Sequence, residues 1–105
     1  AGVVTAPAAS AETAESTGVV VQANGTAVFG ADGVNIRKTP FLNGKINGKG
    51  YRGQGADLIC VAVGDPDPVS GIASWYKLRN RVTGVTGFVN YAYLDQVFWT
   101  NPQSC

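Results

Sequence analysis

Histidine is absent from this 105-residue sequence, and charged residues make up only 14% of it. Without an imidazole there can be no Ser-His-Asp triad, no histidine metal ligand and no histidine general acid or base. The formal net charge of +1 makes nucleic acid a poor partner. No apolar run approaches the roughly 20 residues of a membrane span. We therefore expect a monomeric, non-enzymatic domain without a metal, a cofactor or a membrane span.

Long helices are also disfavoured. Fourteen glycines and five prolines interrupt the chain, and its apolar runs are short and rich in Val, Tyr and Phe. A chain of this length forms one domain with a single small core. The sequence therefore predicts an all-β fold.

The stretch around which the chain is organised is residues 74–94, SWYKLRNRVTGVTGFVNYAYL. Residues 75–80 alternate with the two-residue period of a half-buried strand, and residues 87–89 open a partner strand after a break at 83–87. In such a strand Trp75 and Tyr76 face opposite sides. We expect two strands, a turn and a closing segment here.

Further strands are predicted upstream at residues 26–29, 33–40 and 56–63, and the last of these is expected to cross the middle of the core. The Asn-Gly pairs at 43–44 and 47–48 are turn signals, and residues 64–71 form a proline-stiffened loop. Residues 18–22 either pair with 26–29 through an Asn24-Gly25 turn or belong to an N-terminal arm.

Residues 1–18 are nearly all Ala, Thr, Ser and Glu with no aromatic residue, which predicts a flexible arm before a domain at residues 19–105. The start of the chain resembles that of a mature protein after removal of an export signal. Two acids, Glu12 and Glu15, lie in the arm, so the rest of the chain carries eight basic and five acidic residues, or +3.

The two cysteines are Cys60, in a strongly apolar run, and Cys105, at the last position. No histidine is present to activate a catalytic thiol, so we predict a Cys60–Cys105 disulfide. Residues 97–99 would then run back across the domain, and Trp99 would cover an open end of the core. A disulfide implies an oxidising, extracytoplasmic setting and hence a secreted protein.

Three motifs resemble bacterial SH3-like (SH3b) domains: GVNIRKTP at 33–40 is similar to their LNVRSGPS entry, SWYKL at 74–78 to their WYKV strand, and TGVTGFVNYAYL at 83–94 to their GKTGWVSSSYL ending. Order and spacing also agree, over about residues 25–97. Lys38, Phe88 and the long loop at 64–71 depart from the pattern. The resemblance implies a small SH3-like barrel of five to seven short strands, a role in binding cell walls or peptides, and, through the cysteine pair, a secreted subset of the family.

Aromatic and polar side chains are the candidate binding residues. Exposed aromatics stack on sugars or line peptide grooves, whereas the alternative role for Trp75, Phe88 and Phe29 is to fill the core. Arg37 can bind a carboxylate or brace a turn. The predicted ligand-binding residues are Asn35, Arg37, Tyr51, Tyr76, Asn90, Tyr91 and Tyr93, with Tyr91 and Tyr93 on one face if their segment is extended.

Asp65 and Asp67 are the best candidates in the sequence for a catalytic carboxylate pair. Their Asp-Pro-Asp-Pro setting indicates turn residues instead.

Two functions remain open. The first is a secreted, non-catalytic module that binds cell-wall peptidoglycan through its glycan or its stem peptide. The alternative is a secreted factor that binds or inhibits another protein, such as a protease.

Overall fold

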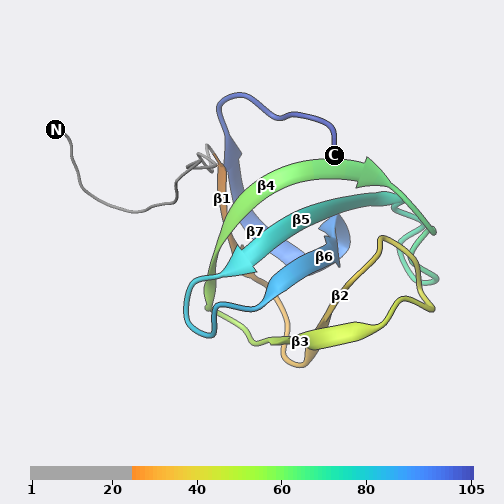
Figure 1. Cartoon of the computed structure of the whole chain (residues 1–105), viewed down its shortest axis with the longest axis horizontal. Coiled ribbons are helices and arrows are strands. Elements are labelled where there is room, and N and C mark those ends of the chain that lie inside the picture. The colour runs from red at the N-terminus through yellow and green to blue at the C-terminus, as the bar shows by residue number, and fades with distance from the viewer. Residues whose placement is uncertain (1–24) are drawn as a thin grey trace, which may run out of the picture.

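The computed structural model describes residues 25–105, which form an all-β domain (Figure 1). One antiparallel sheet contains seven strands in the order β3-β2-β6-β5-β4-β1-β7, and no α-helix occurs within these residues. The elements are β1 (Gly25–Phe29), β2 (Val34–Arg37), β3 (Ile46–Gly50), β4 (Gly55–Val63), β5 (Ser74–Asn80), β6 (Thr86–Asn90), the 3₁₀ turn η1 (Tyr91–Tyr93) and β7 (Leu94–Trp99). The all-β prediction is confirmed. The sheet is strongly curved but open, because β3 and β7 end the strand order and do not pair with each other.

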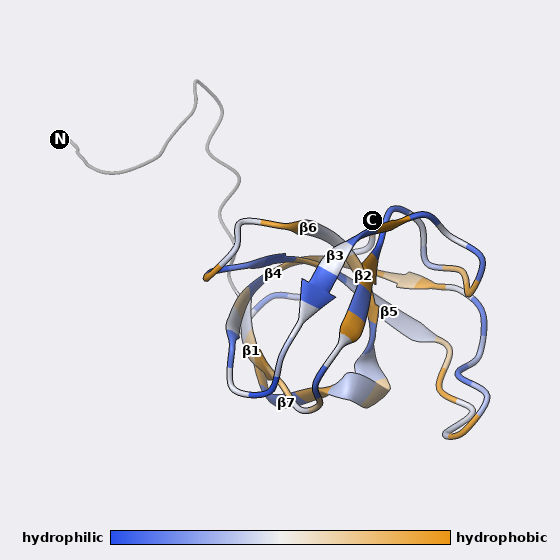
Figure 2. Cartoon of the chain, turned by 90° about the horizontal axis from the view of Figure 1, so that it is seen from below, coloured by the Kyte–Doolittle hydropathy of each residue, from blue (hydrophilic) through white to orange (hydrophobic). Residues whose placement is uncertain are grey.

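The core lies inside the curve of the sheet. Every second residue of β1 and β2 is buried, and so are Ala56, Leu58 and Cys60 of β4, as the two-residue period of a strand requires. The largest fully buried apolar side chains are Phe29, Ile36, Leu58, Leu78 and Val89. Figure 2 shows β2 with hydrophobic residues beside the largely hydrophilic β3, which fits the place of β3 at an edge of the sheet.

Gly50 allows the core to close around Phe29. A Cβ atom on Gly50 would overlap the Phe29 ring, so only glycine fits at this position of β3. Gly25 likewise leaves room for the side chain of Trp99, because a Cβ atom on Gly25 would lie 2.8 Å from Trp99 Cγ. The side chain of Trp99 packs against the core cluster at this end, as the sequence predicted.

The C-terminal residues return to β4. Beyond Leu58, where the β1 pairing stops, the amide of Val61 donates to the carbonyl of Gln103, and the amide of Cys105 donates to the carbonyl of Val61. Val61 and Ser104 thus form a parallel bridge. The predicted Cys60–Cys105 disulfide is present, with the two Cα atoms 4.9 Å apart.

Several local predictions are corrected. Asn47-Gly48 lies inside β3 rather than in a turn, because Ile36 pairs with Gly48 and Arg37 with Ile46, leaving Asn47 as a bulge. The Asn43-Gly44 pair does lie in a turn. Tyr91–Tyr93 is a 3₁₀ turn rather than an extended segment, because Asn90 caps it with its side chain. The predictions for residues 1–18 and 18–22, including the hairpin through Asn24-Gly25, lie outside the described residues.

Of the three expected core aromatics, Phe29 and Trp75 are buried and Phe88 is not. Phe29 is in the core, but Phe88 is only half-buried and pairs with Arg37 and Lys77 on the other side of the sheet. Trp75 is buried on that same side, in register with Asn90. The strand alternation explains both positions, since Leu78 and Val89 already occupy the core side of β5 and β6. We call this side, opposite the core, the outer face.

Candidate functional site: a pocket between β2 and the β4–β5 loop

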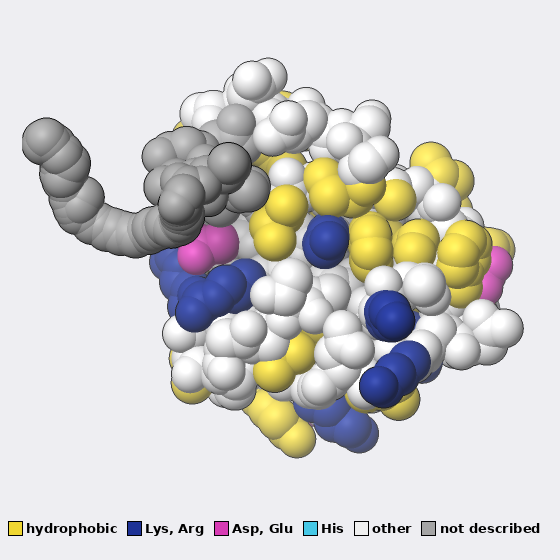
Figure 3. Space-filling view, viewed as in Figure 1, with side chains coloured by type: hydrophobic (Ala, Val, Ile, Leu, Met, Phe, Trp, Pro, Cys, Tyr) yellow, Lys and Arg dark blue, Asp and Glu magenta, His cyan; other side chains and the backbone are white. Residues whose placement is uncertain are grey.

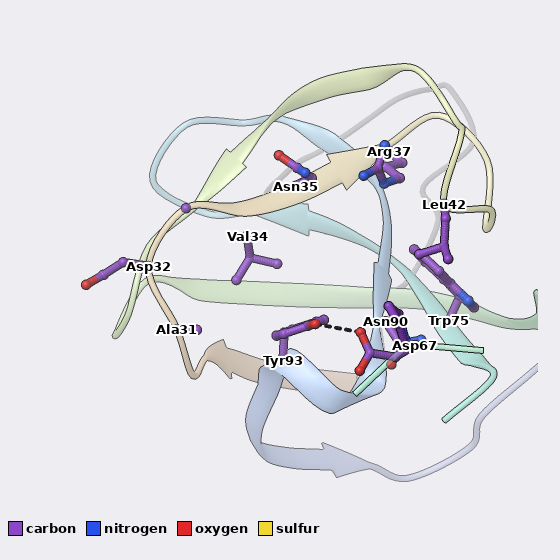
Figure 4. Close-up of a pocket in the computed structure, with 12 residues that line it drawn as sticks. Ala31, Asp32, Val34, Asn35, Arg37, Leu42, Asp67, Trp75, Asn90 and Tyr93 are labelled. Carbon is purple, nitrogen blue, oxygen red and sulfur yellow. Dashed lines mark hydrogen bonds between the residues drawn. The ribbon is translucent and has the colours of Figure 1, made fainter. Parts of the chain in front are cut away.

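A pocket of about 300 Å³ opens between β2, the β4–β5 loop and η1 (Figure 4). Apolar, aromatic and charged side chains all contribute to its wall. The lining residues are Ala31, Asp32, Gly33, Val34, Asn35, Arg37, Leu42, Asp67, Pro68, Trp75, Asn90 and Tyr93. Its size and mixed lining are typical of a site for a small ligand or part of a larger one.

Strand β2 contributes Val34, Asn35 and Arg37 to this pocket. Val34 points into the pocket toward Tyr93, whereas Asn35 lies on the opposite side of β2, on the outer face, as alternation along a strand requires (Figure 4). Arg37 Nη1 donates a hydrogen bond of 2.8 Å to the carbonyl of Gly44, which holds the guanidinium over the β2–β3 turn. Arg37 therefore braces a turn, which is one of the two roles expected from the sequence, and it also lines the pocket.

The charge of Arg37 has no acidic partner in the described part of the chain. The salt bridge formed within residues 25–105 joins Arg81 and Asp57. The carboxylates of Asp32 and Asp67, which line the same pocket, and of Asp65 in the adjoining loop are bound by other groups: by the amide of Arg52, the hydroxyl of Tyr93 and the amide of Leu42 respectively. A guanidinium with further donors and no carboxylate attached is suited to an anionic ligand group.

Asp67 is the most heavily bonded group in the pocket. It is buried and accepts hydrogen bonds from the Tyr93 hydroxyl, from the amides of Val69 and Ser70, and from the Ser70 hydroxyl. The Tyr93 hydrogen bond, followed by the backbone bond from Ser70, lowers the pKa of Asp67 despite its burial. The same bond to Asp67 raises the pKa of Tyr93.

The geometry of Asp65 and Asp67 is that of turn residues. Asp67 organises the backbone at 67–70, and Asp65 connects the loop to Leu42. An ionised Asp67 with four donors is a poor proton donor, because its acceptor sites are occupied and its pKa is lowered.

Trp75 and Asn90 form the back wall. Trp75 Nε1 donates to the carbonyl of Asp65 at 2.8 Å. Asn90 Nδ2 donates to the carbonyl of Ile72, while its Oδ1 accepts from the amide of Ala92. Asn90, one of the predicted ligand-binding residues, lines the pocket, and its side-chain amide also fastens the loop and η1.

Asn35 differs from Asn90. Its Oδ1 is buried and has no hydrogen-bond partner among the described residues. An unsatisfied buried acceptor is costly, and a donor reaching it would be favourable.

The seven predicted binding residues separate into groups. Asn35, Arg37, Asn90 and Tyr93 line the pocket. Tyr76 and Tyr91 instead belong to an aromatic cluster with Trp99, in which the Tyr76 ring lies 5.3 Å from that of Tyr91 and 5.2 Å from that of Trp99. Burial, and then the neighbouring Tyr91, raise the pKa of Tyr76. Tyr51 is exposed in the β3–β4 connection and does not line the pocket.

The turn at η1 explains why Tyr91 and Tyr93 separate. A 3₁₀ turn advances about 120° per residue, so side chains two apart do not share a face. Tyr91 consequently reaches Tyr76, and Tyr93 reaches Asp67.

The sequence search matches this chain to no protein-family model, and no curated protein or solved structure is significantly similar to it. Residues 25–105 contain no group of three potential His, Cys, Asp or Glu metal ligands. Over the same residues no helix is long and apolar enough to cross a bilayer.

Proposed function

We propose that the domain is a secreted, non-catalytic binding module of the SH3-like barrel type, and that its pocket takes part of the bacterial cell-wall peptidoglycan. Of the two components of the wall, the carboxylate-bearing stem peptide fits the lining better than the glycan. Arg37 is the observation that carries the proposal, because it brings a guanidinium without an acidic partner in residues 25–105 to a pocket walled by Trp75 and Tyr93.

The barrel assignment has its own support. The short strands curve strongly, a 3₁₀ turn separates the last two of them, and β1 lies between β4 and the final strand β7. With the three sequence motifs, this arrangement favours an SH3-like barrel over a flat sheet. Secretion is supported by the Cys60–Cys105 disulfide, which persists in oxidising compartments.

In the bound state, Arg37 would hold a peptide carboxylate. Leu42 and Trp75 would contact the apolar part of the peptide. Asp67 and Asn90 would act by keeping the pocket wall rigid, which lowers the entropic cost of binding.

The test is titration of a soluble stem peptide with a free C-terminal carboxylate, beside the same peptide amidated at that end. Loss of a charge-assisted bond costs about 1.5–3 kcal/mol, so Arg37→Gln and amidation should each weaken binding roughly 10- to 100-fold. Arg52→Gln, which removes the same charge from another loop, should leave the affinity unchanged. The proposal fails if the wild-type domain stays unbound on walls of several peptide types in moderate salt.

A second candidate is a factor that binds another secreted protein. Val63, the last residue of β4, and Val69, in the β4–β5 connection, are 83% and 91% exposed, and burial of these side chains against a protein partner would be favourable. Affinity capture from a culture supernatant tests it. A specific partner lost on Val63→Ser/Val69→Ser would support this function, and capture of no protein would contradict it.

A further inference from the structure

The register of the sheet brings four basic side chains from three strands, β2, β3 and β5, onto the outer face. Arg37 on β2 pairs with Phe88 on β6, which pairs in turn with Lys77 on β5. Arg79 lies two residues from Lys77 on the same side of β5. Lys49 on β3 pairs with Asn35, two residues from Arg37 on β2. We call Arg37, Lys49, Lys77 and Arg79 the basic face.

Acidic side chains do not neutralise the basic face. Asp57 pairs with Arg79 in the sheet, but its carboxylate is bound by Arg81, at 2.8 Å from Nε and 2.6 Å from Nη2. No member of the basic face forms a salt bridge within residues 25–105. Figure 3, which looks onto β4, β5 and β6, shows Lys and Arg side chains spread across this side and acidic ones only near its margins.

The spacing of these cations selects a polymer over a small anion. Neighbouring strands lie about 4.8 Å apart and alternate residues of one strand about 7 Å apart, so the backbone positions of successive cations in the order Lys49, Arg37, Lys77, Arg79 are separated by roughly 7–10 Å along the sheet. One small anion can bind one or two of these flexible side chains but cannot reach all four. A chain that carries a charge in every repeat can lie across all four.

We propose that the basic face binds a flexible polyol–phosphate chain, an anionic polymer whose repeats are joined by phosphodiesters. A phosphodiester stays ionised at every physiological pH, and Arg and Lys both bind it. Phe88, half-buried between Lys77 and Arg37, offers apolar contact to the polyol carbons. This choice rests on the secretion proposed above, because outside the cytoplasm such a polymer is more accessible than nucleic acid.

The experiment measures binding of the oxidised domain to immobilised poly(glycerol phosphate). The face variant is Lys49→Gln/Lys77→Gln/Arg79→Gln. The control is Lys38→Gln/Lys45→Gln/Arg52→Gln, which removes the same net charge from residues outside the basic face. Both variants keep Arg37 and the pocket, so stem-peptide binding reports separately on the function proposed above, and thermal melts confirm that both are folded.

Wild-type affinity should fall roughly 20-fold between about 50 and about 200 mM salt, as expected when about three phosphates are neutralised. The face variant should bind at least about tenfold more weakly, and the control within about threefold of wild type, if position rather than net charge decides. Equal losses in the two variants would overturn the proposal, as would no binding to poly(glycerol phosphate). Tighter binding to a single-stranded oligothymidylate of equal charge would overturn the choice of polymer.

Discussion

The hydroxyl of Tyr93 donates a hydrogen bond of 2.5 Å to Oδ1 of Asp67, joining η1 to the β4–β5 loop across 26 residues of sequence. Together with the bonds from Asn90 to Ile72 and from Trp75 to Asp65, it fixes one wall of the pocket. The shape of the pocket therefore depends on a small polar network.

This network predicts a dependence of stability on pH. The pKa of Asp67 is below its ordinary value of 3.8 in the folded chain, so its ionised form stabilises the fold above about pH 4. That contribution is lost as the pH falls through the lowered pKa. In acid denaturation followed by circular dichroism, Asp67→Asn should remove this part of the acid transition. An unchanged acid profile in the variant would contradict the assignment.

Removing only the Tyr93 hydroxyl should weaken the same network. Tyr93→Phe is expected to lower the free energy of unfolding by about 1 kcal/mol and to raise the pKa of Asp67, because the largest cause of its lowering is gone. Tyr51→Phe, on an exposed ring away from the pocket, should change neither. Urea titrations and side-chain carboxyl NMR measure the two effects.

Reduction of the disulfide should have the largest effect on stability. Closing a loop with a sequence separation of 45 is worth about 4 kcal/mol by the chain-entropy estimate. For a domain of this size the loss corresponds to a fall in Tm of roughly 20 °C, with a change in Trp99 fluorescence as the tail leaves. Calorimetry with and without reductant tests this, and equal Tm values in the two scans would refute it.

The close approach at Gly50 predicts a contrast between two glycines. Gly50→Ala would drive a methyl group into the Phe29 ring and should destabilise the domain by about 1–3 kcal/mol. Gly55→Ala is the matched control, because the nearest atom to its Cβ would be 3.6 Å away. Denaturant midpoints compare the two, and similar losses would show that Phe29 moves aside freely.

Asn80 should be sensitive for a different reason. Its fully buried side chain donates to Gln54 and accepts from the amides of Val82 and Thr83, which shapes the β5–β6 turn. Asn80→Leu leaves these groups without a partner, at an expected cost of about 1–3 kcal/mol. Val82→Ser, at an exposed position of the same turn, serves as the control in thermal melts.

Strand positions could be predicted from the sequence wherever side chains alternate. The runs around Val34 to Arg37, Ala56 to Val63 and Trp75 to Asn80 all became strands, because one face of each is buried. The disulfide could be predicted because Cys60 lies in an apolar strand and no histidine offers another role for the thiols. The prediction of a turn at Asn47-Gly48 was wrong, because this pair lies within β3, where Asn47 forms a bulge in the pairing with β2.

The pocket was only partly predictable. That Asn35 and Arg37 share one face of β2 follows from alternation along the strand, whereas Leu42, Asp67 and Trp75 reach the site through contacts distant in sequence. The Asp-Pro-Asp-Pro stretch signalled a turn but not which carboxylate would face Tyr93. Tyr76 and Tyr91 were assigned to a binding surface, but no pattern in the sequence revealed that they pack on each other.

The return of the C-terminal tail to Val61 has a consequence for association between molecules. A strand edge with unpaired amides and carbonyls is a template for another chain, and β4 would present one beyond Leu58 if residues 103–105 were absent. In the oxidised protein these residues occupy that edge, and the Cys60–Cys105 bond keeps them there. Reduction would remove the covalent restraint on these residues, and we expect it to favour opening of this edge of β4 to strand exchange with a neighbouring molecule.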